Sequence, residues 1–416
     1  MSSAGPGAHP LTFAELWREL EPVGRDPQTG GYRRYSWTPA DTACRAWFTG
    51  QAERRGLAVE TDNNGNLWAW WGPKRPGAIA TGSHLDSVPD GGAFDGPLGV
   101  VSALAAVDLL KEKKRAFSPE RSVVLAAFTE EEGARFGVPC LGSRLLTGVV
   151  DPDAARVLTD DAGTMLADAM IAAGQDPGYL GPRDDLLDGL GAFVELHVEQ
   201  GRALAPRGAT LGLAEGIWPH GRWRFDFTGR ADHAGTARLA DRRDPMLPYA
   251  ATVLAARQAA ADNNAVATFG KVIVEPNGTN AVPSAVRAWL DARAPDEAAV
   301  ADTVTTVRSA SESFCEEHRV TLSVRQESFT PLVRFDQALR DRIAGTLAAA
   351  GVTAPVLPTG AGHDAGVLAA RIPTAMLFVR NPTGVSHSPA EHADLADCEA
   401  GVRALAAVLE DLAGPT

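Results

Sequence analysis

The chain has 416 residues and a formal net charge of −13, and it contains no basic run. An acidic balance of this size argues against non-specific binding to nucleic acid, and no apolar stretch approaches the length that crosses a membrane. The length is sufficient for a large core and predicts two or three domains.

Helices and buried strands alternate in the first half of the chain. Helices are predicted over residues 11–21 and 39–56, the second after "TPAD", where a Thr cap is followed by Pro in the first turn. The stretch GPLGVVSALAAVDLLKEKK has the length and the apolar stripe of another helix. The predicted strands are NLWAWWG, GAIATGSHLD, RSVVLAAFTEEEG and GAFVELHVEQG. This alternation predicts a largely parallel sheet that is covered on both faces.

The pattern changes near Ala214. GRWRFDFTGRADHAG alternates like a half-exposed antiparallel strand, and a helix follows from about Asp244 to Asp262. Then come the strands AVATFGKVIVEPNG and AVRAWLDARAPD, a helix over 297–318 and the strand RVTLSVRQESF. The order strand, helix, two strands, helix, strand predicts a ferredoxin-like sandwich that is inserted as its own domain over residues 215–330.

The α/β pattern returns after this insert. A helix is predicted near 335–350, the strand IPTAMLFVRN follows, and a last helix covers about 394–413. We therefore expect an α/β domain that is split between residues 1–214 and 331–416.

The cysteines favour a reducing compartment. Cys44, Cys140, Cys315 and Cys398 are widely scattered and have no CxxC spacing, which is typical of a cytoplasmic protein. The first residues, MSSAGPGAHPLTF, lack a basic start followed by an apolar core, so no signal peptide is expected. We expect a cytoplasmic protein.

Four apolar strands lead to a histidine or a carboxylate. These side chains are His84, with Asp86 and Asp95 after it, the run Glu130, Glu131 and Glu132, then His197, and finally His387 in "GVSHSPAEH". One histidine near a strand end is more often a hydrogen-bonded rim residue, but four such endings predict a shared site beyond the strand ends. Mixed nitrogen and oxygen donors suit zinc, manganese or cobalt. No compact motif such as HExxH anchors this prediction.

A resemblance to a known family gives these residues roles. "GSHLDSVPDGGAFDGPLGV", "FTEEEGARFG", "ELHVEQG", "DHAGT", "RRDP", "NAVPSAVRAWLDAR", "GAGHDA" and "GVSHSP" occur in this order. Over about residues 30–395 the chain resembles the N-carbamoyl-L-amino-acid hydrolase, β-ureidopropionase and allantoate amidohydrolase family, within the dinuclear-zinc aminopeptidase-like clan. The resemblance implies a metallo-aminopeptidase-like catalytic domain with an inserted lid and dimerisation domain. It also implies that a metal-bound water removes a small N-acyl group (carbamoyl, ureido or formyl) from an L-amino acid or an allantoate-like substrate.

The resemblance further implies two divalent ions per subunit, zinc or manganese or cobalt. Asp95 would bridge both ions, with His84 and His197 completing one site and Glu132 and His387 the other. Asp86 would orient His84 through its other ring nitrogen, and the peptide after Asp95 is expected to be cis. Glu131 would be the general base beside the metal, whereas Glu130 is expected to be a solvated or supporting acid.

The resemblance implies substrate contacts as well, several of them from the insert. His233 would stabilise the oxyanion, Arg293 would bind the α-carboxylate, and Asn280 and Gln200 would contact the substrate. His220 stands where relatives commonly have a glutamine of the carboxylate pocket, so it would favour a second carboxylate on the substrate or reflect loop drift. His363, Asp364 and Arg238 are expected at the edge of the site. A homodimer is expected to form through residues 215–330.

Two other functions remain open at this point. One is an N-acyl-amino-acid deacylase or a peptidase of the same clan, although His197 stands where such peptidases tend to have aspartate or glutamate. The other is a non-catalytic metal-binding relative, which the presence of the whole ligand and base set disfavours.

Overall fold

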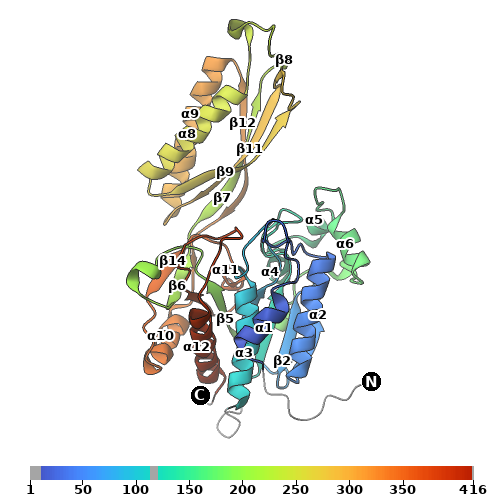
Figure 1. Ribbon diagram of the computed structural model, residues 1–416, viewed down its shortest axis with the longest axis vertical. Helices are drawn as coiled ribbons and strands as arrows, with labels where there is room; N and C mark the ends of the chain where they lie inside the picture. The colour runs from blue at the N-terminus through green and yellow to red at the C-terminus, as the bar shows by residue number, and fades with distance from the viewer. Residues whose placement is uncertain (1–10, 113–119, 415–416) are drawn as a thin grey trace. The chain divides into compact units, whose positions relative to one another are not determined.

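The computed structural model describes residues 11–112 and 120–414. They form two compact units, of which one ends at Glu215 and resumes at Arg334, and the other comprises Gly216–Val333 (Figure 1). Within the described residues, no helix is long and apolar enough to cross a membrane.

Among the described residues, a mixed sheet of nine strands forms the centre of the first unit. Its central strands, in the order β4-β3-β5-β15, are parallel, whereas β1, β2 and β6 join its sides in antiparallel pairs. The centre of the sheet is therefore parallel, in agreement with the prediction of a largely parallel sheet, and the antiparallel strands lie at its sides. The strands are β1 (Ala58–Thr61), β2 (Leu67–Trp71), β3 (Ala78–His84), β4 (Val123–Phe128), β5 (Leu190–Val198), β6 (Leu211–Ile217), β13 (Val333–Arg334), β14 (Val356–Thr359) and β15 (Thr374–Val379).

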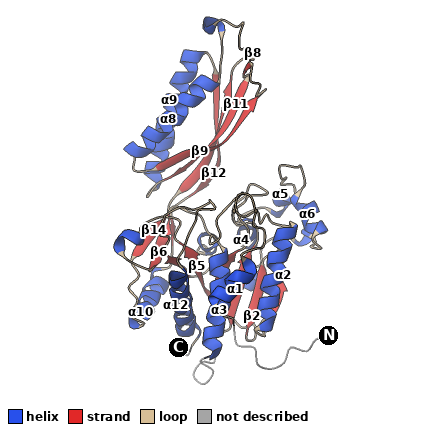
Figure 2. Cartoon of the chain, in the orientation of Figure 1, coloured by secondary structure: helices blue, strands red, loops and turns tan. Residues whose placement is uncertain are grey.

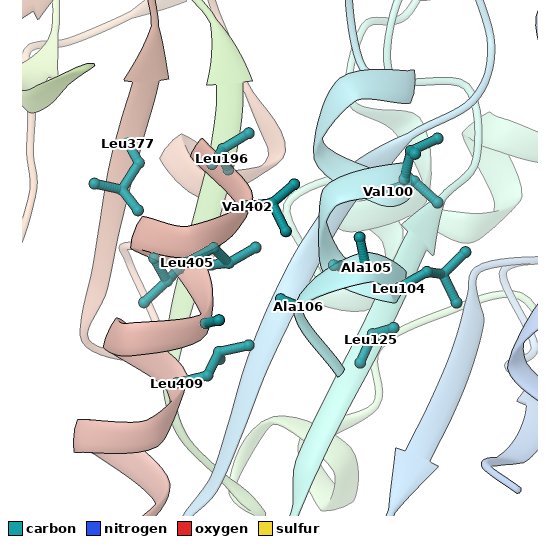
Figure 3. Packing of buried hydrophobic residues seen from close by; sticks show 14 of the residues in the cluster. Val100, Leu104, Ala105, Ala106, Leu125, Leu196, Leu377, Val402, Leu405 and Leu409 are labelled. Atoms are coloured by element: carbon teal, nitrogen blue, oxygen red, sulfur yellow. The ribbon is translucent and has the colours of Figure 1, made fainter. Parts of the chain in front are cut away.

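Helices cover both faces of this sheet. On one face, α3 and α12 pack against each other and against the central strands, where their side chains form one apolar cluster (Figure 3). Helix α11 lies on the other face. Glu195 of β5 points to the face opposite its neighbour Leu196, which belongs to that cluster, and Glu195 accepts the backbone N–H of Ala365 in α11. The helices are α1 (Phe13–Leu20), α2 (Pro39–Arg54), α3 (Pro97–Glu112), α4 (Leu141–Leu146), α5 (Pro152–Arg156), α6 (Leu166–Ala172), α7 (Asp184–Leu187), α10 (Gln337–Ala349), α11 (Asp364–Leu368) and α12 (Leu395–Ala413).

Local sequence accounts for most of these helices. A capping box of Thr12 and Glu15 starts α1, and proline stands at the first position of α2 and of α3. The predicted helices of this unit agree with α1, α2, α10 and α12 to within two residues at each end. However, α3 is buried on nearly all sides, as is typical of a helix inside a core, and not along one stripe. The short helices α4 to α7 were not predicted.

The second unit, all of whose residues are described, is an antiparallel sheet with two helices on one face (Figure 2). The sheet order is β12-β7-β11-β9, and the apolar side chains of Trp223, Phe225, Phe227 and Leu290 face the core beneath the helices. The elements are β7 (His220–Thr228), α8 (Met246–Asp262), β9 (Val266–Glu275), β11 (Ala285–Arg293), α9 (Glu297–His318) and β12 (Thr321–Thr330), with a small ribbon of β8 (Asp232–His233) and β10 (Ala281–Val282). This chain order is that of a split βαβ sandwich.

Candidate metal centre

Adjacent parallel strands bring the predicted ligands to one edge of the first unit's sheet. His84 is the last residue of β3, His197 is the penultimate residue of β5, Glu132 follows β4, and His387 follows β15. Asp95 lies in the loop between β3 and α3. Because the carboxyl ends of parallel strands meet at the same edge, these side chains converge although they are far apart in the sequence.

The five side chains form two groups that share Asp95. In one group, Asp95 Oδ1 lies 3.6 Å from His84 Nε2 and 3.3 Å from His197 Nε2. In the other, His387 Nε2 lies 3.3 Å from Asp95 Oδ2 and 3.5 Å from Glu132 Oε2. Ligand atoms that are 2.0 to 2.1 Å from a tetrahedral ion lie about 3.3 Å from one another. Both groups therefore have the spacing of ligands around a common ion.

The hydrogen bonds of the histidines fit a metal at this position. His84 Nδ1 lies 3.1 Å from the carbonyl oxygen of Asp86, and His197 Nδ1 lies 2.9 Å from that of Val198. A carbonyl can only accept, so each Nδ1 carries the proton and each Nε2 presents a lone pair. Both Nε2 atoms, and Glu132 Oε1, are buried without a hydrogen-bond partner in the described part of the chain. A lone pair that faces a carboxylate oxygen in this way needs a proton or a metal ion between the two atoms, and a single metal ion would satisfy both Nε2 atoms and Asp95 at once.

The site also concentrates buried acid. Burial raises the pKa of three carboxyl groups to about 7 and that of a fourth to about 8, and nearby carboxylates add to each shift (Glu130, Glu132, Glu391 and Asp364). Several buried carboxylates without a compensating positive charge are unfavourable. Divalent cations would stabilise their ionised forms.

Glu131 lies beside the ligand groups without belonging to either. Its Oε2 is 3.7 Å from His84 Nε2, and its Oε1 accepts a hydrogen bond from Cys140 Sγ at 3.3 Å. Burial raises the pKa of Glu131 well above its usual range, which makes its carboxylate a better proton acceptor. Glu130 is only 1% exposed, so of its two expected roles it has the supporting one and not the solvated one; its Oε1 accepts the backbone N–H groups of Arg135 and Phe136 and so holds the next turn.

Asp86 contacts the site differently from the prediction. The carbonyl oxygen of Asp86 is the nearer partner of His84 Nδ1, because the carboxylate Oδ1 lies 3.6 Å away. The carboxylate instead accepts the backbone N–H groups of Glu131 and Glu132 at 3.2 and 3.0 Å. Asp86 therefore fixes the backbone that carries the base candidate and a ligand candidate.

The loop that carries Asp95 corrects another expectation. Within residues 11–112 and 120–414 the one cis peptide is Glu275–Pro276. The expectation of a cis peptide after Asp95 is therefore wrong. Gly96 makes the turn into α3 with a φ of +85°, and a Cβ there would lie 2.4 Å from the His84 ring. The loop needs this glycine for its positive φ and for the close approach of the imidazole. Gln200 Nε2 donates to Asp95 Oδ2 at 2.7 Å, which places Gln200 at the shared carboxylate.

The predicted substrate residues of the insert form two pairs within the second unit. His220 and Arg293 stand opposite each other on β7 and β11, and Asp291 binds the guanidinium of Arg293 with two bonds of 2.7 and 3.0 Å. His233 and Asn280 lie together at the β8–β10 ribbon, where Asn280 accepts the N–H of Ala234.

The tautomer of His233 leaves its Nε2 as a hydrogen-bond donor. Its Nδ1 accepts from the backbone N–H groups of Gly235 and Thr236 at 3.0 and 3.2 Å, so the proton resides on Nε2 of an exposed ring. Arg238 pairs with Asp241 on the surface.

Several residues around the centre were missed or misplaced. His363 and Asp364 are buried and do not lie at the rim: the His363 ring packs edge-on against His197 at 4.5 Å, and Asp364 accepts from Ser143. Glu195, Cys140, Ser386 and Glu391 were not predicted to contribute. Glu195 could have been found because it lies two residues before His197 and shares its face of β5.

Comparisons with known proteins identify the family of the chain. A family model described as Peptidase family M20/M25/M40 matches residues 80–411. The chain is 35% identical over 397 residues to an N-carbamoyl-L-amino acid amidohydrolase of Geobacillus stearothermophilus, with 94% of this chain and 96% of that protein covered. It is 32% identical over 400 residues to an allantoate amidohydrolase of Escherichia coli (strain K12), with 95% and 96% covered. The crystal structure of an amidase of the hydantoinase/carbamoylase family from Burkholderia vietnamiensis matches with a TM-score of 0.89 at 29% identity, covering 98% of both chains. These similarities confirm the resemblance drawn from the motifs.

Proposed function

The chain belongs to peptidase family M20/M25/M40, and from this premise we propose that it is a metal-dependent amidohydrolase that removes a small N-acyl group. The carbamoyl, ureido or formyl group would come from an L-amino acid or an allantoate-like substrate. The observation that carries the proposal is the pair of ligand groups that share Asp95, with Glu131 beside them. The names of the two relatives given above, an N-carbamoyl-L-amino acid amidohydrolase and an allantoate amidohydrolase, indicate substrates of this class.

The residues present would hold two divalent ions, zinc or manganese or cobalt. His84, Asp95 and His197 form one donor set, and Asp95, Glu132 and His387 form the other. When bound, such ions polarise the amide carbonyl and lower the pKa of water, which supplies the nucleophile at neutral pH.

Glu131 performs the proton transfers in this proposal. Its carboxylate takes a proton from the attacking water as the new C–O bond forms at the acyl carbon. It then gives that proton to the amide nitrogen as the C–N bond breaks, so that the amine leaves neutral. The structure supports this role because the carboxylate is buried, next to His84, and outside both donor sets.

Residues of the second unit would bind the substrate. His233 has its proton on Nε2 and is suited to stabilise the developing oxyanion, with Asn280 beside it. Arg293, held in place by Asp291, is suited to bind a carboxylate with two parallel hydrogen bonds. Gln200 would contact the amide group that is cleaved.

The inserted unit would serve as a lid and as the dimer interface. Its strands β9 and β12 are the outer strands of an antiparallel sheet, and such edges are commonly paired or covered. The free and buried state of all four cysteines supports a reducing cytoplasm as the location.

The test is metal analysis of the active protein combined with a panel of substrates. Turnover of N-carbamoyl or N-formyl amino acids or of allantoate, with two ions per subunit, is the expected result. Turnover of dipeptides or long-chain N-acyl amino acids in their place would identify a deacylase or peptidase, and stoichiometric absence of metal from active protein would end the proposal.

A further inference from the structure

Glu391 connects the two loops that carry Asp95 and His387. Its Oε1 accepts the backbone N–H groups of Phe94 and Asp95 at 2.8 and 3.0 Å. Its Oε2 accepts from Ser386 Oγ at 3.1 Å, and the same Oγ lies 3.2 Å from Asp95 Oδ2. The carboxylate thus bonds the backbone of Asp95 and also Ser386, the residue next to His387.

The chain leaves room for this contact. Glu391 is buried, and a Cβ on Gly92 would lie only 2.4 Å from its carboxyl carbon. A larger residue at position 92 would push the Glu391 side chain away from the N–H groups that it accepts. The glycine is therefore required by the approach of Glu391 and not by its own φ.

The two ligand groups differ in how firmly the fold holds them. His84 and His197 lie on central strands and are 1% and 0% exposed, so the sheet fixes their positions. The His387 side chain is 51% exposed and lies on a loop with a φ of +53°. The spacing between His387 and Asp95 therefore depends on contacts between two loops.

We propose that Glu391 is a positioning residue that holds Asp95 and His387 at the spacing required by the ion that both would bind with Glu132. The inference rests on the metal centre of the proposed function. It assigns Glu391 no contact with substrate or metal.

The same contacts predict which substitutions matter. Glu391→Ala removes both carboxylate oxygens and with them the hydrogen bonds that join the two loops. The ion at Asp95, Glu132 and His387 should therefore bind at least tenfold more weakly. The ion at His84, Asp95 and His197 should weaken by a smaller factor, because the two groups share Asp95 but the sheet still holds both histidines of this one. Glu391→Gln keeps an amide oxygen to accept both N–H groups and an amide N–H to bond Ser386, so it should behave like the native chain.

The experiment measures metal binding by the full chain. Metal is removed with a chelator, zinc is added back against a competing chelator, and the bound ions are counted by elemental analysis. Asp397→Ala is the matched control, because it removes another buried carboxylate, one that binds Arg380 at the start of the His387 loop and takes no part in the contact between Glu391, Ser386 and Asp95. Native chain, Glu391→Gln and Asp397→Ala should bind two ions, and Glu391→Ala one at limiting zinc.

The outcomes separate this inference from the proposed function. A native chain that binds no zinc refutes the metal centre itself. A native chain that binds two ions, together with Glu391→Ala that binds both with native affinity or loses both equally, refutes the positioning role and leaves the function standing. Equal weakening in Glu391→Gln and Glu391→Ala would show that charge matters and positioning does not. If Glu391→Ala fails to fold, Ser386→Ala, which removes the hydroxyl between Glu391 Oε2 and Asp95 Oδ2, must weaken the same ion or the inference is overturned.

Discussion

Replacing Glu131 by glutamine tests the assignment of base and ligand most directly. Glutamine has the shape of glutamate and still offers Cys140 Sγ an oxygen to donate to, but it cannot accept a proton from water. Because Glu131 lies outside both donor sets, both ions should remain bound. General-base assistance contributes about 10²- to 10⁴-fold, so kcat should fall by that factor, which corresponds to about 3 to 5 kcal/mol of activation free energy.

The same substitution makes a prediction about stability. Burial raises the pKa of Glu131 in the folded state, so the folded protein binds this proton more tightly than the unfolded chain does. In that case ionisation of Glu131 destabilises the fold as pH rises above the unfolded value. Glutamine carries no charge at any pH, so the metal-free variant should melt no lower than the metal-free native chain at neutral pH.

The assay combines steady-state kinetics, metal counting and thermal melting, with Glu132→Gln as the comparison. Glu132 belongs to a donor set, so its variant should bind fewer than two ions. If Glu131→Gln loses metal while Glu132→Gln keeps it and loses turnover, the assignment is off by one residue. Native activity in Glu131→Gln would refute its role as the base.

Chelation should abolish activity, and zinc, manganese or cobalt should restore it; failure of all three to restore a still-folded protein would contradict a metal-dependent reaction. Arg293→Ala should lower kcat/KM by a factor that corresponds to about 2 to 4 kcal/mol, the scale of a lost charged partner. Substrate analogues without the α-carboxylate should lose a similar amount on the native chain, and the variant should turn them over little more slowly than the native chain does. His220→Gln should lower activity on N-carbamoyl- or N-formyl-glutamate relative to neutral substrates, and an unchanged ranking would show that position 220 does not select the side chain. Sedimentation should show a dimer that depends on residues 215–330; a stable, fully active monomer at assay concentration would refute the interface.

The sequence by itself determined the central strands and the long helices of the first unit, together with the candidate ligands. Short apolar runs such as GAIAT and SVVLAAF, rich in β-branched and small residues and followed by polar residues, favour buried strands, and caps and prolines mark where helices begin. Parallel strands end at one edge, so His84, His197 and Glu132 could be assigned to a common site before their distances were known. The ordered motifs added the family, which the comparisons confirmed.

Only the tertiary structure decided how the loops meet at that edge. The bond from Asp95 to Glu391 joins residues 296 positions apart, and no periodicity in the sequence encodes such a contact. Burial likewise decided that Glu130 supports a turn and that Asp364 lies inside the unit. The tendency to form a strand or a helix is encoded largely by neighbouring residues, whereas a loop contact depends on the closure of the whole sheet. That is why the candidate ligands could be predicted and Glu391 could not.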